Sequence, residues 1–177
     1  LLLCVLAAAA GCITGALTAG FGRVLLWIGT FRTEHLISCV PFLPIAGVCM
    51  VWIYQKYGRE SSQGMSLIFD AADGTAKRIP LRLIPLLIGS TWLTHLCGGS
   101  AGREGAALQL GGSVGSMLGR VFRLAERDKQ VLMLCGMSAA FSAIFRTPIA
   151  APVFAMEVVC VGAMRYAALV PLSLIHI

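Results

Sequence analysis

Charged side chains are scarce in this sequence. Asp, Glu, Lys and Arg make up 12% of the 177 residues, whereas 58% of the residues are hydrophobic. A soluble domain carries roughly 25% charged residues, so this chain has too little polar surface to cover a globule in water. The shortage argues against a soluble enzyme. It predicts an all-α, multi-pass protein of the cell membrane, surrounded by the lipid bilayer.

Other missing patterns exclude further classes of protein. None of the cysteines forms a CxxC pair, so neither a metal site nor another cofactor is expected, and packing is their predicted role. The basic residues flank apolar runs and do not form one stripe, which argues against a nucleic-acid partner. The seven cysteines lie at positions 4, 12, 39, 49, 97, 135 and 160.

The sequence contains several long runs without a charged residue. Residues 1–22, 36–55 and 83–102 each approach the ~20 residues that a membrane-spanning helix needs. The first run has no basic leader, which favours a spanning helix over a cleaved signal peptide. We expect long helices at 1–29, 36–57 and 79–97, polar segments at 58–78 and 120–129, and shorter helices at 105–122, 130–145 and 148–163.

The ends of the sequence and its charge distribution add two expectations. The chain begins without Met and stops within an apolar stretch, so we interpret residues 1–177 as a single transmembrane domain that is a fragment of a longer protein. Short loops rich in Lys and Arg tend to be cytoplasmic. Segment 56–82 carries five basic residues and segment 23–35 carries two, so we place the 56–82 side in the cytoplasm.

The stretch CGGSAGREGAALQLGGSVG, residues 97–115, places Glu104 among glycines in an otherwise apolar region. A carboxylate at membrane depth is costly and by default suggests a function. Here it falls at a helix start, where free N–H groups and the helix dipole favour an anion. An ionised Glu104 would occupy the anion's position and a protonated one would leave it, which couples proton movement to anion movement.

Two plainer roles compete with this hypothesis. Glu104 can be a helix cap paired with Arg103 at a membrane surface, and composition and spacing alone leave that reading open. A phosphate-binding loop is excluded because no GK[ST] ending follows and no strand precedes it. Gly111, Gly115 and Gly119 form small-xxx-small spacings, which indicate close helix packing and not a site.

Two motifs give the chain a family resemblance. GSAGREGAALQLGGSVG resembles the GREGP-x-V-Q-x-G signature of the CLC family of anion channels and anion/proton antiporters. AAFSAIFRTPIAAPVFAMEVV, residues 139–159, resembles that family's later F-N-A-P stretch. The resemblance implies a CLC-type bundle of tilted and broken helices, present here as the N-terminal repeat of an inverted-repeat subunit, with a homodimeric whole protein. It also implies that Glu104 is the gating residue.

Departures from the chloride-type pattern point to one branch of that family. The family's first anion-binding motif, G-S-G-I-P, corresponds here to Gly64-Met65-Ser66, where Met65 replaces the chloride-contacting serine. Ala106 replaces the proline of GREGP. Both features resemble the fluoride-exporting branch, although a packing methionine is the commoner role for such a residue. The anion-binding set this implies is Gly64, Met65, Ser66, Gly102, Arg103, Gly105 and Ala106.

The resemblance implies a fluoride/proton antiporter. A chloride channel or chloride/proton antiporter is the first alternative, and a non-transporting membrane protein with Glu104 as a helix cap is the second.

Three further polar residues lie in or beside apolar segments. Glu157 corresponds to the position just before the family's proton-transfer glutamate, so it is a candidate for a proton path, with structural pairing to Arg146 or Arg165 slightly favoured. A histidine can relay protons near neutral pH, but we expect His95 to be a packing histidine. Arg146 stands where the family has asparagine, and we expect it to act as a cation at a helix end.

Overall fold

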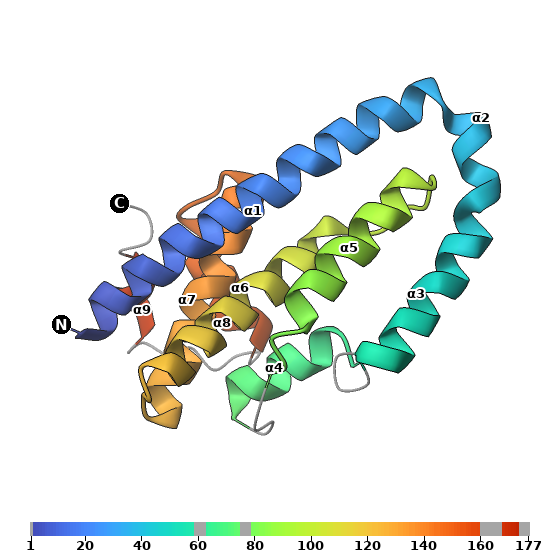
Figure 1. Cartoon of the computed structure of the whole chain (residues 1–177). Helices are drawn as coiled ribbons and strands as arrows, with labels where there is room; N and C mark the ends of the chain where they lie inside the picture. Colours follow the sequence, from blue (N-terminus) through green and yellow to red (C-terminus); the bar gives the residue numbers. More distant parts are fainter. Residues whose placement is uncertain (1, 59–62, 75–78, 160–167, 174–177) are drawn as a thin grey trace.

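The chain forms a bundle of helices, seen in a computed structural model that describes residues 2–58, 63–74, 79–159 and 168–173. No strand occurs in these ranges, in agreement with the all-α prediction (Figure 1). The elements are α1 (Leu2–Glu34), α2 (Leu36–Cys39), η1 (Val40–Phe42), α3 (Leu43–Tyr57), α4 (Met65–Asp73), α5 (Leu83–Leu96), α6 (Arg103–Val121), α7 (Glu126–Phe145), α8 (Ala150–Val159) and α9 (Leu169–Ser173).

Among the described residues, two helical stretches are long and apolar enough to cross a membrane, judged by length and composition. They are Leu2–Glu34, with 33 residues, and Leu36–Tyr57, with 22 residues. The first extends beyond the expected 1–29. The second was expected to be one regular helix, but η1 interrupts it, because Pro41 lies at the first turn and donates no backbone hydrogen bond.

Several other predicted boundaries were wrong. The segment 58–78 was expected to be polar apart from a helix start at Gly64-Met65, and it contains all of α4, which begins at Met65. The helix predicted at 79–97 begins only at Leu83, after Pro80. The helix predicted from residue 130 begins at Glu126, because Glu126 and Asp128 suit the positive end of the helix dipole in its first turn. For the helix predicted at 148–163, the described part ends at Val159.

The centre of the bundle is the close packing of α6 on α7. A Cβ built on Gly111 would collide with the backbone carbonyl of Gly136, and one on Gly136 would collide with that of Gly111. One turn further, a Cβ on Gly115 would lie 2.7 Å from the Cα of Met133. The small-xxx-small spacing therefore works as predicted, by letting two backbones touch.

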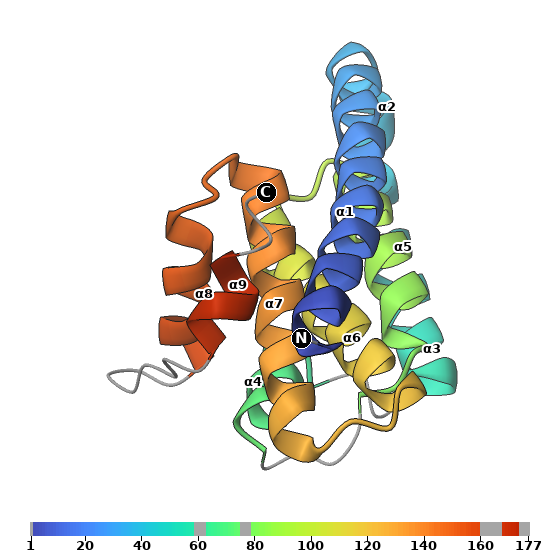
Figure 2. The ribbon, with the colours of Figure 1, turned by 90° about the vertical axis from the view of Figure 1, so that its left-hand side faces the viewer.

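Helix α1 runs antiparallel to α6 along the length of the bundle. Leu6 and Ala10 in its first half pack with Leu118 near the end of α6, and Phe21 in its second half packs with Ala106 near the start of α6. On the other side of α7 lie α8 and α9 (Figure 2). Stacked rings of Phe141 and Phe154, with centroids 4.2 Å apart, join α7 to α8.

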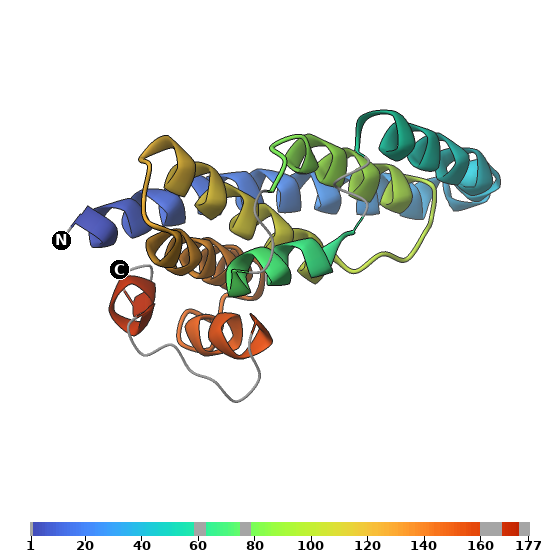
Figure 3. The same cartoon turned by 90° about the horizontal axis from the view of Figure 1, so that it is seen from below.

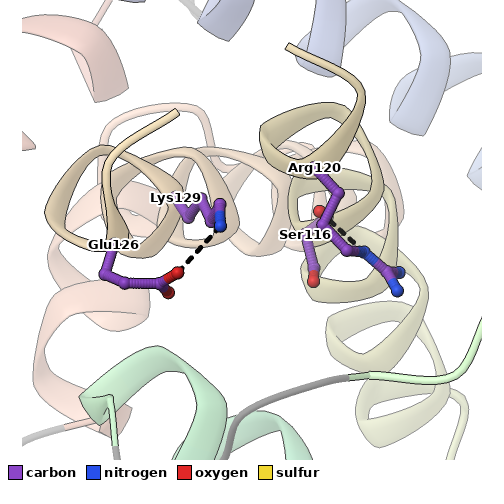
Figure 4. Close-up of polar contacts among 4 residues, drawn as sticks. All are labelled: Ser116, Arg120, Glu126 and Lys129. Atoms are coloured by element: carbon purple, nitrogen blue, oxygen red, sulfur yellow. Dashed lines mark hydrogen bonds and ion pairs between the residues drawn. The ribbon is translucent and has the colours of Figure 1, made fainter. Parts of the chain in front are cut away.

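Local contacts lie on either side of the connection between α6 and α7 (Figure 4). Lys129 Nζ pairs with Glu126 Oε1 at 2.8 Å within the first turn of α7, and Arg120 Nε donates to the Ser116 carbonyl within α6. Both contacts lie within a single helix. The segment predicted at 120–129 is therefore a connection only between Val121 and Glu126, and its two ends belong to α6 and α7.

Candidate functional site

The site is built from two helix starts, and the first is that of α4. Its N-cap residue, Gly64, has φ +62° and ψ −131°, a conformation that only glycine adopts without strain. A Cβ built on Gly64 would have no heavy atom within 4 Å. Glycine is therefore required here by its backbone angles and not by a crowded environment. Met65 is the first helical residue and is half-buried.

The second helix start follows a glycine turn at the end of α5. Gly98 has φ +87°, the left-handed conformation that commonly ends a helix, and the Gly99 N–H donates to the Thr94 carbonyl at 2.8 Å. The chain then passes through an extended Gly102, the N-cap of α6. Arg103 and Glu104 are therefore in the first turn of α6, which begins two residues before the predicted start at residue 105.

The two helix starts lie side by side. A Cβ built on Gly105 would lie 3.8 Å from both Cγ and Sδ of Met65, which is ordinary van der Waals contact. Further along the pair, Ile68 of α4 is fully buried, and its Cγ2 would lie 2.8 Å from a Cβ on Gly112. Figure 3 shows α4 from below, where it packs against α6 and α7. Forty residues of sequence separate Met65 from Gly105 (105 − 65 = 40), yet the fold joins them.

Neither helix start is capped by the side chain of its N-cap residue. Both N-caps, Gly64 and Gly102, are glycines and make no side-chain cap hydrogen bond. The first N–H groups of any α-helix have no partner within the helix. Two sets of such donors therefore begin at one place, and together they supply the partial positive charge that attracts an anion.

Glu104 is exposed, and its carboxylate folds back toward the start of its own helix. Its Oε2 would lie 2.9 Å from a Cβ built on Gly102. Within the described residues it forms no ion pair with Arg103, and Arg103 is also exposed. The Glu104–Arg103 ion pair that the helix-cap alternative predicts is therefore not found among the described residues. The helix dipole still favours a carboxylate in the first turn of α6.

The other predicted anion ligands differ in the hydrogen-bond donors that they can offer to an anion. The Ser66 hydroxyl donates to the Gln63 carbonyl at 2.7 Å, so it is already engaged locally. Ala106 is only 4% exposed and packs with Leu110 and Phe21, so its backbone N–H is its only polar group for an anion. Gly105 lies beside the Met65 side chain and offers its backbone N–H.

The remaining polar candidates lie on other parts of the bundle. Glu157 is half-buried on α8, beside Val158, which packs against the cluster that contains Ile68. His95 Nδ1 lies 2.8 Å from the Thr91 carbonyl one turn earlier, which fits the predicted packing role. Arg146 caps the C-terminus of α7 with φ +55° and ψ +36°, which agrees with its predicted place at a helix end.

Sequence reasoning missed a set of buried hydroxyls. Thr14, Thr18 and Ser113 have side-chain oxygens that are buried without a hydrogen-bond partner in the described structure. Thr14 and Thr18 lie one turn apart on the buried stripe of α1. Two threonines four residues apart in the apolar stripe of a long helix were the sequence signal for these buried hydroxyls.

Comparison with known proteins identifies the family. Residues 46–176 match the family model described as voltage gated chloride channel. The chain belongs to this family, the CLC proteins. CLC proteins are membrane-embedded transport proteins and not enzymes, as the sequence motifs predicted.

Individual relatives agree with this assignment. A chloride/fluoride channel protein of Pseudomonas syringae pv. tomato is 41% identical over 160 residues, which is 88% of this chain and 35% of the relative. An H+/Cl− exchange transporter of Citrobacter koseri is 26% identical over 164 residues, or 85% of this chain and 35% of the relative. The chain thus spans about a third of the length of these curated relatives.

Solved structures establish the fold. The crystal structure of a CLC-type fluoride/proton antiporter superposes with a TM-score of 0.94 at 45% identity, covering 98% of this chain and 44% of that chain. A slow cyanobacterial Cl−/H+ antiporter superposes with a TM-score of 0.80 at 23% identity, with the same coverages of 98% and 44%. The predicted CLC-type helical bundle is confirmed.

Proposed function

We propose that the whole protein is an anion/proton antiporter that exports fluoride across the cell membrane in exchange for protons. The observation that carries the proposal is the contact of Met65 with Gly105, which brings two uncapped helix starts together beside Glu104. The solved antiporter with 45% identity and the chloride/fluoride relative with 41% identity support the same function.

In this proposal the backbone N–H groups at both helix starts bind the anion. The residues that provide or shape this binding are Gly64, Met65, Ser66, Gly102, Arg103, Gly105 and Ala106. One helix start carries about half an elementary charge, which is too little alone to replace the water around an anion. Several partial charges attract the ion enough for it to enter and still let it leave.

Glu104 couples the proton to the anion. When ionised, its carboxylate competes with the anion for the same donors. When protonated, it has lost the negative charge that those donors attract, so it yields the position. Glu157 on α8 is the proposed companion on the proton path. Its place near the cluster around Ile68 puts it on an element that packs against α4.

The chain itself is the N-terminal repeat of a two-repeat subunit in this proposal, and the whole protein is a homodimer with one pathway in each subunit. The chain covers 44% of the solved antiporter. The anion site is then completed by residues beyond this chain, so flux requires the full-length protein.

The selectivity for fluoride depends on Met65 and Ala106. A methionine side chain has no hydrogen-bond donor for an anion, so the strong donors are backbone N–H groups. The experiment is anion efflux from liposomes containing the full-length protein, measured with ion-selective electrodes. We expect fluoride efflux to be much faster than chloride efflux. Equal rates would favour the chloride branch, and no flux of either ion would favour the helix-cap alternative.

A growth experiment tests the same function in the cell. Deletion of the gene is expected to make its host sensitive to fluoride, most strongly at acid pH, where hydrogen fluoride enters cells. Complementation with the full-length gene should restore growth, and the Glu104→Gln variant should restore it less. An unchanged fluoride tolerance after deletion would contradict fluoride export.

A further inference from the structure

Helices α3 and α5 meet at both ends, and two side-chain contacts join them in between. Tyr54 Oη lies 3.4 Å from Ser90 Oγ, and Thr94 Oγ1 donates to Met50 Sδ at 3.4 Å. At one end a Cβ built on Gly58 would lie 2.9 Å from Leu86 Cδ1, and at the other a Cβ on Gly99 would lie 3.2 Å from Leu43 Cδ1. Between these contacts is a cavity of 320 Å³. Its walls include Met50, Ile53 and Tyr54 of α3 and Leu86, Gly89 and Leu93 of α5.

The lining suits an alkyl chain and not water. Most of the wall is aliphatic, and an apolar cavity of this kind does not hold ordered water. Its polar groups, the hydroxyls of Tyr54 and Ser90, lie 3.4 Å from each other. The cavity borders Gly89, where a built Cβ would meet no heavy atom within 4 Å. Lipid tails are as apolar as leucine and fill such a space without desolvation cost.

One end of this α3–α5 groove is basic. The Gly58–Leu86 contact places the end of α3 beside the first turn of α5, whose N-cap is Arg82. Lys56 lies in the last turn of α3, with Nζ 4.8 Å from the centre of the Trp52 ring and 5.5 Å from that of Tyr57. Lysine beside Trp and Tyr at a helix end is typical of the headgroup level of a bilayer. The start of α5 adds its own partial positive charge.

The rest of α3 has the surface of a helix that faces lipid. Its apolar side chains are well exposed, including Ile45 at 60%, Val48 at 71% and Val51 at 56%. Figure 1 shows α3 at the edge of the bundle, with α5 between it and α6. An apolar surface that ends in aromatic and basic side chains fits the lipid bilayer. A protein segment bound at this place would be expected to offer Lys56 an acidic partner.

We propose that the α3–α5 groove binds one acyl chain of an anionic phospholipid, whose phosphate lies beside Lys56 and Arg82. The lipid fills the space that these contacts leave between the two helices, so it stabilises the position of α5. The proposal rests on the membrane setting of the CLC family and is independent of which anion the protein carries.

The test is native mass spectrometry of the full-length protein, titrated with phosphatidylglycerol or phosphatidylcholine in detergent. We expect preferential binding of phosphatidylglycerol. Gly89→Leu fills the groove and should weaken this binding at least roughly tenfold, since excluding even two methylenes costs about that much. Lys56→Gln should leave the groove open and reduce the preference for phosphatidylglycerol by roughly fivefold.

The controls separate this site from lipid bound elsewhere. Gly20→Leu places the same side chain on exposed α1, where a Cβ meets no heavy atom within 4 Å, and should bind phosphatidylglycerol as the unmodified protein does. Inorganic phosphate should not displace the lipid. The proposal is wrong if Gly89→Leu and Lys56→Gln both bind lipid normally, if phosphate competes fully, or if a structure of the full-length protein shows its own chain in the groove.

Discussion

The side chain of Met65 packs against Gly105, so that the first turn of α4 meets the first turn of α6. Each helix alone offers a weak attraction for an anion, and each lacks a side-chain cap that would use its free N–H groups. The contact joins two sequence features that share no local pattern. It also places a side chain without a donor beside the proposed anion position.

The first prediction concerns this contact. Met65→Ser in the full-length protein should raise chloride efflux relative to fluoride efflux, because serine adds a hydroxyl donor where methionine has none. The ratio of the two fluxes from liposomes is the measurement. Met117→Ser, which changes a half-buried methionine near the C-terminal end of α6, is the matched control and should leave the ratio unchanged. An unchanged ratio in Met65→Ser would remove Met65 from the selectivity account.

The second prediction concerns the α6–α7 seam. Gly111→Ala should destabilise the full-length protein by about 1–3 kcal/mol or more, because its methyl group meets the Gly136 carbonyl and forces the helices apart. Thermal unfolding in detergent measures the loss. Gly20→Ala, which meets no atom within 4 Å, should unfold at the original temperature or slightly above it, since alanine favours a helix. Equal unfolding temperatures for both variants would mean that the backbones do not touch.

The third prediction concerns the end of α7. Arg146 has φ +55°, a conformation that costs a residue other than glycine about 1–3 kcal/mol. Arg146→Gly removes this strain and should raise the unfolding temperature of the full-length protein. Arg127→Gly in the first turn of α7 should lower it by contrast, because glycine costs about 1 kcal/mol within a helix. A lower unfolding temperature for Arg146→Gly would show that its side chain stabilises the structure more than its backbone strains it.

Much of the helical framework was predictable because apolar runs and glycine spacings are local signals. The start of α7 was not, since the charges of Glu126 and Asp128 resemble a loop until their place in a first turn is known. The start of α4 at Gly64-Met65 was implied by the family motif, but its extent was not predictable, for a similar reason. Asp70 and Asp73 made the segment resemble a solvated connection, whereas Ile68 is fully buried against α6.

The candidate site was predictable only in its parts. Glycines mark both helix starts in the sequence. The resemblance to the CLC family implied that both starts belong to one anion-binding site. No periodicity predicts that Met65 reaches Gly105, because that contact depends on how α4 crosses α6. The same holds for Ser66, whose hydroxyl is engaged by the Gln63 carbonyl, and for the buried hydroxyls of Thr14 and Thr18.

The central claim is that Glu104 couples protons to anion movement. The most direct test is proton uptake into liposomes that contain the full-length protein and release fluoride down its gradient, compared with the Glu104→Gln variant. Gln has the same shape but no titratable charge, so the account predicts that the variant loses proton uptake against a gradient while the unmodified protein retains it. Glu126→Gln, a surface change at the α6–α7 turn, should behave as the unmodified protein. Proton pumping at an undiminished rate by Glu104→Gln would contradict the account.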